Sequence, residues 1–156
     1  MRTFLTCRHS VMKALIQRVS SASVEVEGRI VGQIKKGILV FIGIEKQDEL
    51  EHANKMINKI LSYRVFSDTE GKMNLSVSDI NGGVLLVSQF TLVAETNNGT
   101  RAGFSTAKPP SEAENIYNHM VGRAKDLSSN IESGIFAADM KVALVNDGPV
   151  TFLLKC

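Results

Sequence analysis

The stretch that decides the fold closes the chain: residues 142–156 read VALVNDGPVTFLLKC. Two apolar, β-branched runs flank the tetrapeptide Asn146-Asp147-Gly148-Pro149, and each run is typical of a β-strand. An Asp-Gly pair alone would make a tight hairpin turn, so a plain hairpin does not need Pro149. Because proline cannot donate to a sheet ladder, we expect Pro149 at a turn, a strand start or a sheet edge, and the general preference of X-Pro bonds favours trans.

Upstream of this stretch, further strands dominate the sequence. Residues 13–44 contain ALIQRV, the alternating run SVEVEGRIVGQI and the apolar run ILVFIGI, which together predict three or four strands. The near-continuous apolar run VLLVSQFTLVAE at residues 84–95 predicts a buried central strand. Residues 136–145 and 150–154 predict the last two strands.

Two segments have the spacing of amphipathic helices. Asp48 with Glu51 predicts a capping box at the first helix, and Ser111 with Glu114, after Pro109-Pro110, predicts one at the second. The first apolar stripe is Leu50, Ala53, Met56, Ile57, Ile60 and Leu61; the second is Ala113, Ile116, Tyr117, Met120, Val121 and Ala124. We expect both stripes to face the core.

Length and patterning favour one soluble α+β domain. A chain of 156 residues suits a single core, and the elements predict a mostly antiparallel sheet, or a barrel-like curl of it, with two covering helices. We expect this domain at residues 12–156, after a dispensable extension at residues 1–11, because MKALIQRV at Met12 resembles a natural start. The longest apolar run is too short to cross a bilayer, so no membrane partner is expected.

The charge and the cysteines restrict the possible partners. Arg2 and Arg8 account for the formal net charge of +2, so acids and bases balance from Met12 onward. Coating a long nucleic acid usually needs a basic excess, and any RNA contact is therefore expected to be local. Cys7 and Cys156 have no CxxC spacing, which favours neither a metal site nor a disulfide and fits a reducing cytoplasm.

Histidine catalysis is disfavoured. His9 lies in the predicted extension, and His52 and His119 fall on the polar faces of the predicted helices, where solvated surface residues are expected. The sequence contains no HExxH, GxSxG, P-loop or GxGxxG motif. We therefore expect no metal and no cofactor.

Polar residues interrupt the predicted central strand at Ser88-Gln89-Phe90-Thr91. Strict alternation would point Gln89 and Thr91 to one face of the sheet and Ser88 and Phe90 to the other. A strand end whose hydroxyls bond to the backbone explains the same residues without any site. Since both interpretations fit the pattern, this segment and NDGPVT remain the two candidate sites.

Together, SQFTL at residues 88–92 and NDGPVT at residues 146–151 resemble the paired signature of the D-aminoacyl-tRNA deacylases. MKALIQRVSSASVEVEG, YRVFSDTEGKMNLSV and GIFAADMKVALVNDGPVTF resemble the same family, so the resemblance runs from about Met12 to the C-terminus. The loop that reads RPxF in many relatives is Arg101-Ala102-Gly103-Phe104 here and lacks the rigidifying proline.

The resemblance implies the fold of that family, a cytoplasmic homodimer, and hydrolysis of the ester at the 3' aminoacyl-adenosine end of D-aminoacyl-tRNA. Gly148-Pro149 would be a cis bond whose carbonyl oxygens enter the other subunit's active site. There they would exclude L-amino acids, whereas achiral glycine would pass, so glycyl-tRNA would also be cleaved. Backbone N–H groups near Phe90 and Thr91 would bind the oxyanion, and the terminal ribose 2'-OH would assist the attack.

The resemblance also implies supporting roles. Ser88 and Gln89 would orient the catalytic site, and Arg18 would brace the Gly-Pro turn, although an ordinary surface ion pair explains Arg18 equally well. The remaining supporting or substrate-binding residues are Asn146, Val150, Thr151 and, around the terminal adenine, Phe136 and Met140. From the sequence alone, Phe136 and Met140 are equally good core residues.

Three alternatives are open. Thr91 has been viewed as a nucleophile in the family, but no base for it is visible. An editing module for L-amino acids or a wrong amino acid is a second interpretation, against which the glycine before Pro149 and the intact SQFTL segment count. A non-catalytic RNA-binding or dimerising β-module is the third, disfavoured by the balanced charge and by the lack of an aromatic RNA-stacking motif.

Overall fold

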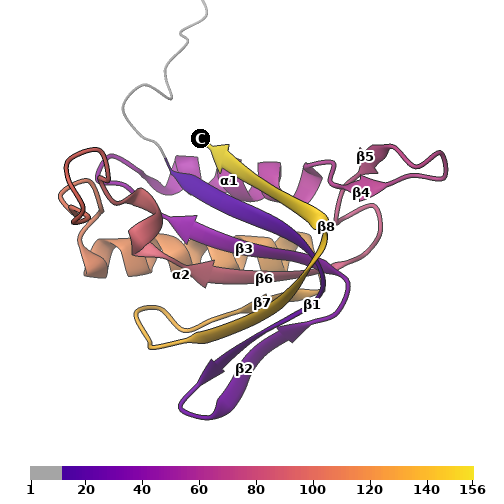
Figure 1. The fold of residues 1–156 in the computed structure, drawn as a ribbon, viewed down its shortest axis with the longest axis horizontal. Helices are drawn as coiled ribbons and strands as arrows, with labels where there is room; N and C mark the ends of the chain where they lie inside the picture. Colours follow the sequence, from indigo (N-terminus) through magenta and orange to yellow (C-terminus); the bar gives the residue numbers. More distant parts are fainter. Residues whose placement is uncertain (1–11) are drawn as a thin grey trace, which may run out of the picture.

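The computed structural model describes residues 12–156; the predicted extension, with Cys7 and His9, lies outside the described part. The elements in chain order, most of them labelled in Figure 1, are β1 (Lys13–Val26), β2 (Arg29–Ile34), β3 (Gly37–Gly43), α1 (Leu50–Ser62), β4 (Phe66–Ser67), β5 (Met73–Leu75), β6 (Gly83–Ser88), the 3₁₀ helix η1 (Phe90–Val93), α2 (Pro110–Leu127), β7 (Ile131–Ser133) and β8 (Lys141–Lys155). None of the described helices is both long and apolar enough to span a membrane.

Six of the strands form one mixed sheet centred on β1. The order is β2-β1-β3-β6-β7, with β8 also pairing with β1. β1 is antiparallel to β2, β3 and β8, whereas β6 is parallel to β3 and to β7. The sheet curls so far that β2 approaches β7, where the Gln33 N–H donates to Glu132 Oε1 at 3.4 Å. The predicted α+β class with a barrel-like sheet is confirmed. Residues 13–44 form three strands, because ALIQRV and SVEV belong to the same strand, β1.

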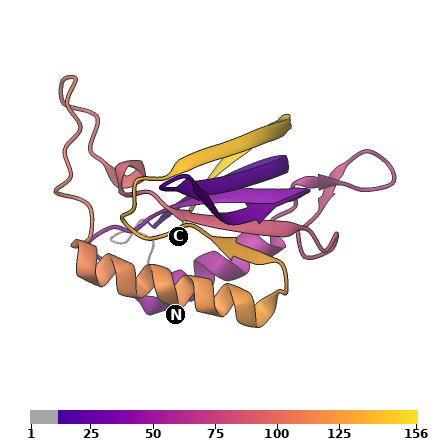
Figure 2. The same cartoon turned by 90° about the horizontal axis from the view of Figure 1, so that it is seen from below.

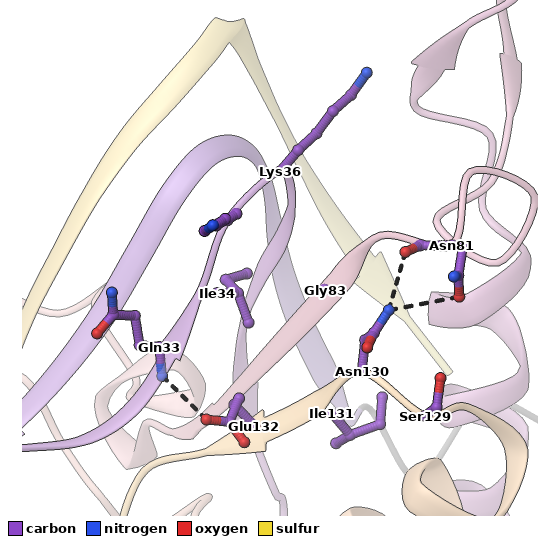
Figure 3. A pocket seen from close by; sticks show the side chains of 10 residues that line it. Gln33, Ile34, Lys36, Asn81, Gly83, Ser129, Asn130, Ile131 and Glu132 are labelled. Atoms are coloured by element: carbon purple, nitrogen blue, oxygen red, sulfur yellow. Dashed lines mark hydrogen bonds between the residues drawn. The ribbon is translucent and has the colours of Figure 1, made fainter.

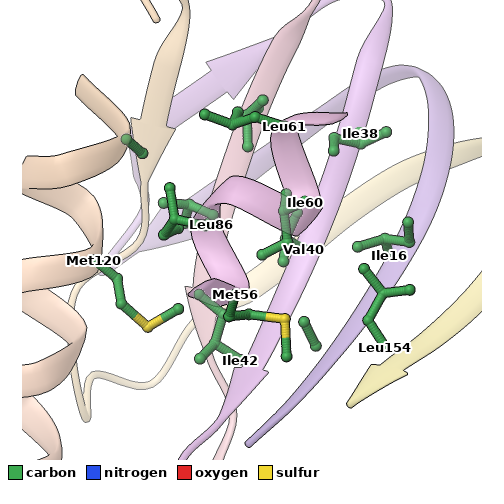
Figure 4. Close-up of a cluster of buried hydrophobic side chains, with 14 of the residues drawn as sticks. Ile16, Ile38, Val40, Ile42, Met56, Ile60, Leu61, Leu86, Met120 and Leu154 are labelled. Carbon is green, nitrogen blue, oxygen red and sulfur yellow. The ribbon is translucent and has the colours of Figure 1, made fainter. Parts of the chain in front are cut away.

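The central strands β3 and β6 are buried on both faces of the sheet. The helices cover one face (Figure 2), and their apolar stripes meet side chains of β1, β3, β6 and β8 there (Figure 4). On β3, Ile38, Val40 and Ile42 belong to this cluster, whereas Leu39 belongs to a second cluster on the opposite face with Leu85 of β6. Burial on both faces explains why these strands are apolar throughout rather than alternating.

The helix starts differ from the prediction. α1 is capped by Glu49, which forms a capping box with His52: the Glu49 N–H donates to His52 Nδ1 at 2.9 Å. Asp48 is buried instead, and its Oδ2 accepts the Glu45 N–H at 2.7 Å. Leu50 is exposed, so it does not join the core. The second predicted capping box is also wrong, since α2 starts with Pro109 as its N-cap and Pro110 at the first helical position, which suits a residue without an N–H.

The two described histidines are not solvated surface residues as predicted. His52 takes part in the cap of α1, and its side chain is only partly exposed. The Nε2 atom of His119 lies 2.7 Å from Asn54 Oδ1, so this hydrogen bond joins α2 to α1. Both histidines therefore have structural partners.

The predicted central strand over residues 84–95 is wrong in its second half. β6 ends at Ser88, and the chain continues as η1, so the expected alternation of Ser88 to Thr91 does not occur. The cause is the end of the neighbouring strand, because the Gln89 N–H makes the last bond, to the Ile42 carbonyl at 2.8 Å. A Cβ at Gly43 would lie 2.7 Å from Val93 Cγ1, so the glycine lets η1 fold against β3.

The end of the chain is one strand rather than two. β8 is continuous, and Phe136 lies in a turn before it, not in a strand. Gln17 of β1 pairs with Thr151 and Val19 pairs with Asn146, so residues 147–150 form a bulge within β8. The Gly148–Pro149 peptide bond in this bulge is cis, the isomer that the resemblance implies, rather than trans. Pro149 therefore lies at a bulge on an edge strand, where proline is tolerated.

Candidate active site

A largely apolar cavity of about 550 Å³ lies where β3 and β6 end. Its walls come from η1, the segment before α2, the start of α2 and the turn between β7 and β8. The lining residues are Ile42, Ile44, Ser88, Gln89, Phe90, Phe104, Ala107, Lys108, Pro109, Pro110, Ala113, Phe136, Ala137, Ala138 and Met140.

The cavity brings together five of the predicted site residues from two distant parts of the sequence. Ser88, Gln89 and Phe90 lie on one wall, and Phe136 and Met140 lie on another. The other predicted residues do not line it. Thr91 lies beside it on η1, and the rest, in or next to the β8 bulge, are Arg18, Asn146, Gly148, Pro149, Val150 and Thr151.

The start of η1 leaves two backbone donors unused. The Leu92 N–H donates to the Gln89 carbonyl at 3.1 Å, which is the first bond of the 3₁₀ turn. Phe90 and Thr91 precede that bond, and within residues 12–156 their N–H groups have no hydrogen-bond partner. Both residues are exposed. Two adjacent free N–H groups beside a cavity are a suitable site for an oxygen that carries negative charge.

The wall that carries Phe136 is fixed by a buried tyrosine. The Tyr117 hydroxyl donates to the Leu86 carbonyl at 2.9 Å and lies 3.3 Å from the Gly134 carbonyl, so α2 is joined to β6 and to the segment before Phe136. The rings of Tyr117 and Phe136 are 5.9 Å apart. Burial raises the pKa of Tyr117 to about 12, so its hydroxyl stays protonated at physiological pH.

The third wall comes from a loop that sequence reasoning largely missed. Residues 104–108 are held to the rest of the fold by backbone bonds, from Lys46 N–H to the Thr106 carbonyl at 3.0 Å and from Lys108 N–H to the Ile44 carbonyl at 3.1 Å. The Thr106 hydroxyl donates to the Val93 carbonyl. Phe104 contacts Phe90 with a ring-centroid distance of 5.2 Å. An aromatic residue within a Gly/Asn/Pro-rich loop was the available signal.

The cavity has little acid–base chemistry of its own. Lys108 is the only charged residue among the described residues that line it, and its ammonium donates to the carbonyls of Asp48 at 2.8 Å and Lys46 at 3.1 Å. No histidine, carboxylate or cysteine is among the described lining residues. Within the part of the chain that the structure describes, no group of three or more His, Cys, Asp or Glu side chains is arranged to hold a metal ion.

The β8 bulge is held by side chains from three segments. Arg18 donates from Nε to the Asp147 carbonyl at 3.0 Å and from Nη1 to the Val65 carbonyl at 2.8 Å. Asn146 Oδ1 accepts the Val150 N–H at 3.1 Å, and its Nδ2 donates to Thr151 Oγ1 at 3.0 Å. The residues between, 147–149, are exposed. The bulge is therefore a well-supported projection of backbone into solvent.

Within one chain the bulge and the cavity are far apart. Arg18 pairs with Ile38 at the start of β3, whereas Ile42 lines the cavity at its end. Four residues of strand span about 13 Å. Figure 1 shows the bend of β8 at one end of β3 and β6, whereas the loop that leads into α2 and lines the cavity lies at their other end.

A second, more polar cleft of about 380 Å³ lies at the start of β6 (Figure 3). It is lined by strand ends and by Asn130, whose amide donates to the Asn81 carbonyl at 3.0 Å. None of the predicted site residues lines this cleft.

Comparison with known proteins agrees with the two signatures. The D-Tyr-tRNA(Tyr) deacylase family model matches residues 15–155. A D-aminoacyl-tRNA deacylase of Saccharophagus degradans is 60% identical over 143 residues, covering 92% of this chain and 99% of the relative. One of Acinetobacter baumannii is 57% identical over 144 residues, covering 92% and 98%.

Solved structures agree as well. A c-Myc DNA Unwinding Element Binding Protein is 40% identical with a TM-score of 0.87, covering 91% of this chain and 97% of that one. A probable eukaryotic D-amino acid tRNA deacylase shares the fold at 14% identity, with a TM-score of 0.82 and coverage of 94% and 100%. With a family match over nearly the whole described chain and relatives of such identity, this chain belongs to the D-Tyr-tRNA(Tyr) deacylase family.

Proposed function

We propose that this protein hydrolyses the ester bond of D-aminoacyl-tRNA in the cytoplasm and releases the free D-amino acid and the tRNA. The observation that carries the proposal is the pair of unused N–H groups at Phe90 and Thr91, beside an apolar cavity, in a chain of this family. Ester hydrolysis passes through a tetrahedral oxyanion, and such donors stabilise it more than they stabilise the ground-state carbonyl.

The nucleophile is a water molecule rather than a protein side chain. Thr91 could attack the ester only if a base took its proton, and no histidine or carboxylate lines the cavity among the described residues. The ribose 2'-OH adjacent to the ester lies within the substrate itself, so it can assist the attacking water where the protein offers no base. Ser88 and Gln89 orient the ester between this water and the two N–H groups.

Selection of the D-enantiomer comes from the β8 bulge of a second subunit. The bulge is exposed and lies about 13 Å along the sheet from its own cavity, so it can act on a substrate only in another copy. β8 pairs with β1 along one edge, and within the described residues its other edge has no partner strand. β8 also exposes Val145, Phe152 and Leu153. An unpaired edge and exposed apolar side chains both suit burial in a homodimer. Arg18, Asn146, Val150 and Thr151 keep the bulge in place.

Backbone oxygens of Gly148 and Pro149 then border the substrate α-carbon. They cannot rotate aside as a side chain can, so the Cβ of an L-amino acid collides with them whereas that of a D-amino acid points away. Glycine has no Cβ and passes, which predicts cleavage of glycyl-tRNA. The terminal adenine binds between Phe136 and Met140, on the wall that Tyr117 fixes.

The test is paired hydrolysis of D-tyrosyl-tRNA and L-tyrosyl-tRNA by the purified protein, with and without a chelator. We expect cleavage of the D-ester, sparing of the L-ester and no effect of the chelator. Equal rates on both esters would refute chiral selection, faster cleavage of the L-ester would indicate an L-selective editing module, and cleavage of neither would refute the enzymatic proposal.

A further inference from the structure

Two exposed aromatic side chains mark one side of the cavity. Phe90 is 63% exposed and Phe104 is 47% exposed, although both are large apolar residues. Their rings are 5.2 Å apart and inclined by 53°, and both line the cavity. Of the other apolar lining residues, Ile42, Ile44 and Ala113 are buried, whereas Pro109, Pro110 and Ala137 are also exposed. The pair therefore forms the large aromatic part of the solvent-facing mouth of the cavity.

The position of the pair is set by the fold rather than by a flexible loop. Phe90 is the first residue of η1, which the Gln89 bond to Ile42 attaches to β3. Phe104 directly follows Gly103, which exchanges two backbone bonds with Glu95, at 2.8 Å and 2.9 Å. A fixed, exposed aromatic surface at a cavity mouth is typical of a site that stacks a planar ligand.

We propose that Phe90 and Phe104 form an aromatic platform that stacks the penultimate nucleobase of the tRNA 3' end. This inference rests on the proposed function, in which the terminal adenosine and its ester fill the cavity. The bound tRNA chain then extends out of the cavity through the mouth as single-stranded RNA. The next planar group along this chain is the base of the preceding nucleotide. Stacking on phenylalanine is tolerant of base identity, which suits an enzyme acting on many tRNAs.

The platform also explains how a chain with balanced charge from Met12 onward can hold RNA. Base stacking contributes affinity without a basic surface, and loss of one stacked base lowers affinity by about 5- to 150-fold. Lys108, the only cation that lines the cavity within residues 12–156, already donates to two carbonyls. Among the described residues at the mouth, stacking on Phe90 and Phe104 is therefore the main interaction available beyond the terminal nucleoside.

The experiment compares two minimal substrates: D-tyrosyl adenosine, and the D-tyrosyl ester of cytidylyl-adenosine, which adds only the penultimate nucleotide. We expect wild-type kcat/KM to be about 5- to 150-fold higher for the dinucleotide. Phe104→Leu, which keeps an apolar side chain but removes the ring, should bring this ratio close to one. Phe104→Tyr, which keeps the ring, should retain the ratio.

A fluorescence measurement separates this proposal from the proposed reaction. The probe is a CCA trinucleotide that carries no amino acid and has 2-aminopurine as its middle base. Its fluorescence should be quenched on binding to the wild type and to Phe104→Tyr, but not on binding to Phe104→Leu. This readout does not depend on ester hydrolysis, so an inactive protein that still quenches the probe would refute only the proposed function. An equal loss of kcat/KM on both substrates in Phe104→Leu, or a wild-type ratio near one, would overturn the platform. Loss of the dimer in Phe104→Leu would also overturn it, because Phe104 would then belong to the subunit contact.

Discussion

The most informative single substitution is Gly148→Ala in the β8 bulge. Gly148 has φ +137°, a region that favours glycine, and an added Cβ would lie 2.8 Å from Val150 Cγ2 and 3.0 Å from Arg18 Nη2. An L-residue in such a conformation costs about 1–3 kcal/mol. Because 1 kcal/mol lowers Tm by about 2–4 °C in a domain of this size, we expect Tm to fall by about 2–12 °C. The bulge should also shift, so hydrolysis of D-tyrosyl-tRNA over L-tyrosyl-tRNA should become less selective.

The matched control for this prediction is Gly28→Ala. Gly28 also has a positive φ, +79°, but an added Cβ would meet no atom within 4 Å, and the residue lies in the turn between β1 and β2. This variant should lose comparable stability and keep full selectivity. If Gly148→Ala lowered Tm but discriminated between the two esters as well as Gly28→Ala does, the bulge would have no part in selection.

Three further predictions concern the catalytic and supporting residues. Thr91→Ala should keep measurable activity on D-tyrosyl-tRNA, because only the Thr91 N–H is used; complete loss with an unchanged circular dichroism spectrum would restore Thr91 as the nucleophile. Tyr117→Phe should lose about 1–3 kcal/mol in urea unfolding, because the buried carbonyls of Leu86 and Gly134 lose their shared donor; an unchanged midpoint would contradict this. Burial raises the pKa of Asp48 above its usual value, so the folded state binds this proton more tightly than the unfolded state, and the resulting stability is lost as pH rises through the raised pKa. The wild type should therefore be more stable relative to Asp48→Asn at pH 4 than at pH 7, and a difference that is independent of pH would refute this assignment.

Local patterns were sufficient to predict most of the elements. The apolar stripes identified both helices, because the 3.6-residue spacing of residues such as Met56 and Met120 reflects the one face that each helix buries. The helix starts could not be predicted as well, since Asp48 looks like a cap in sequence but is buried beside the Glu45 N–H. Cap choice here depends on packing between segments that the sequence does not place relative to one another.

The ends of strands were the least predictable feature. Residues 84–95 are apolar on both sides of Ser88, and only the end of β3 near Gly43 makes the chain turn into η1. Likewise, residues 147–150 resemble a hairpin turn, but Arg18 and the register of β1 keep both flanking runs in one strand. In each case the partner strand determines the outcome.

The candidate site was predictable in part. Ser88, Gln89 and Phe90 of the SQFTL segment do meet Phe136 and Met140 around one cavity. The loop wall formed by Phe104, Ala107 and Lys108 had no periodicity by which to detect it, because its position depends on backbone bonds to residues 44–46. The distance between the bulge and the cavity of the same chain is a property of the folded sheet alone.

We propose that the β8 bulge of one subunit acts on the cavity of the other, and a mixed dimer tests this most directly. One subunit carries Gly148→Ala, and the other, with a different purification tag, carries Ala138→Trp to fill its cavity. The purified mixed dimer has one usable cavity, in the Gly148→Ala chain, and we expect that cavity to regain wild-type selectivity between D- and L-tyrosyl-tRNA, because the other subunit supplies an intact bulge. A mixed dimer as unselective as the Gly148→Ala homodimer would contradict the claim.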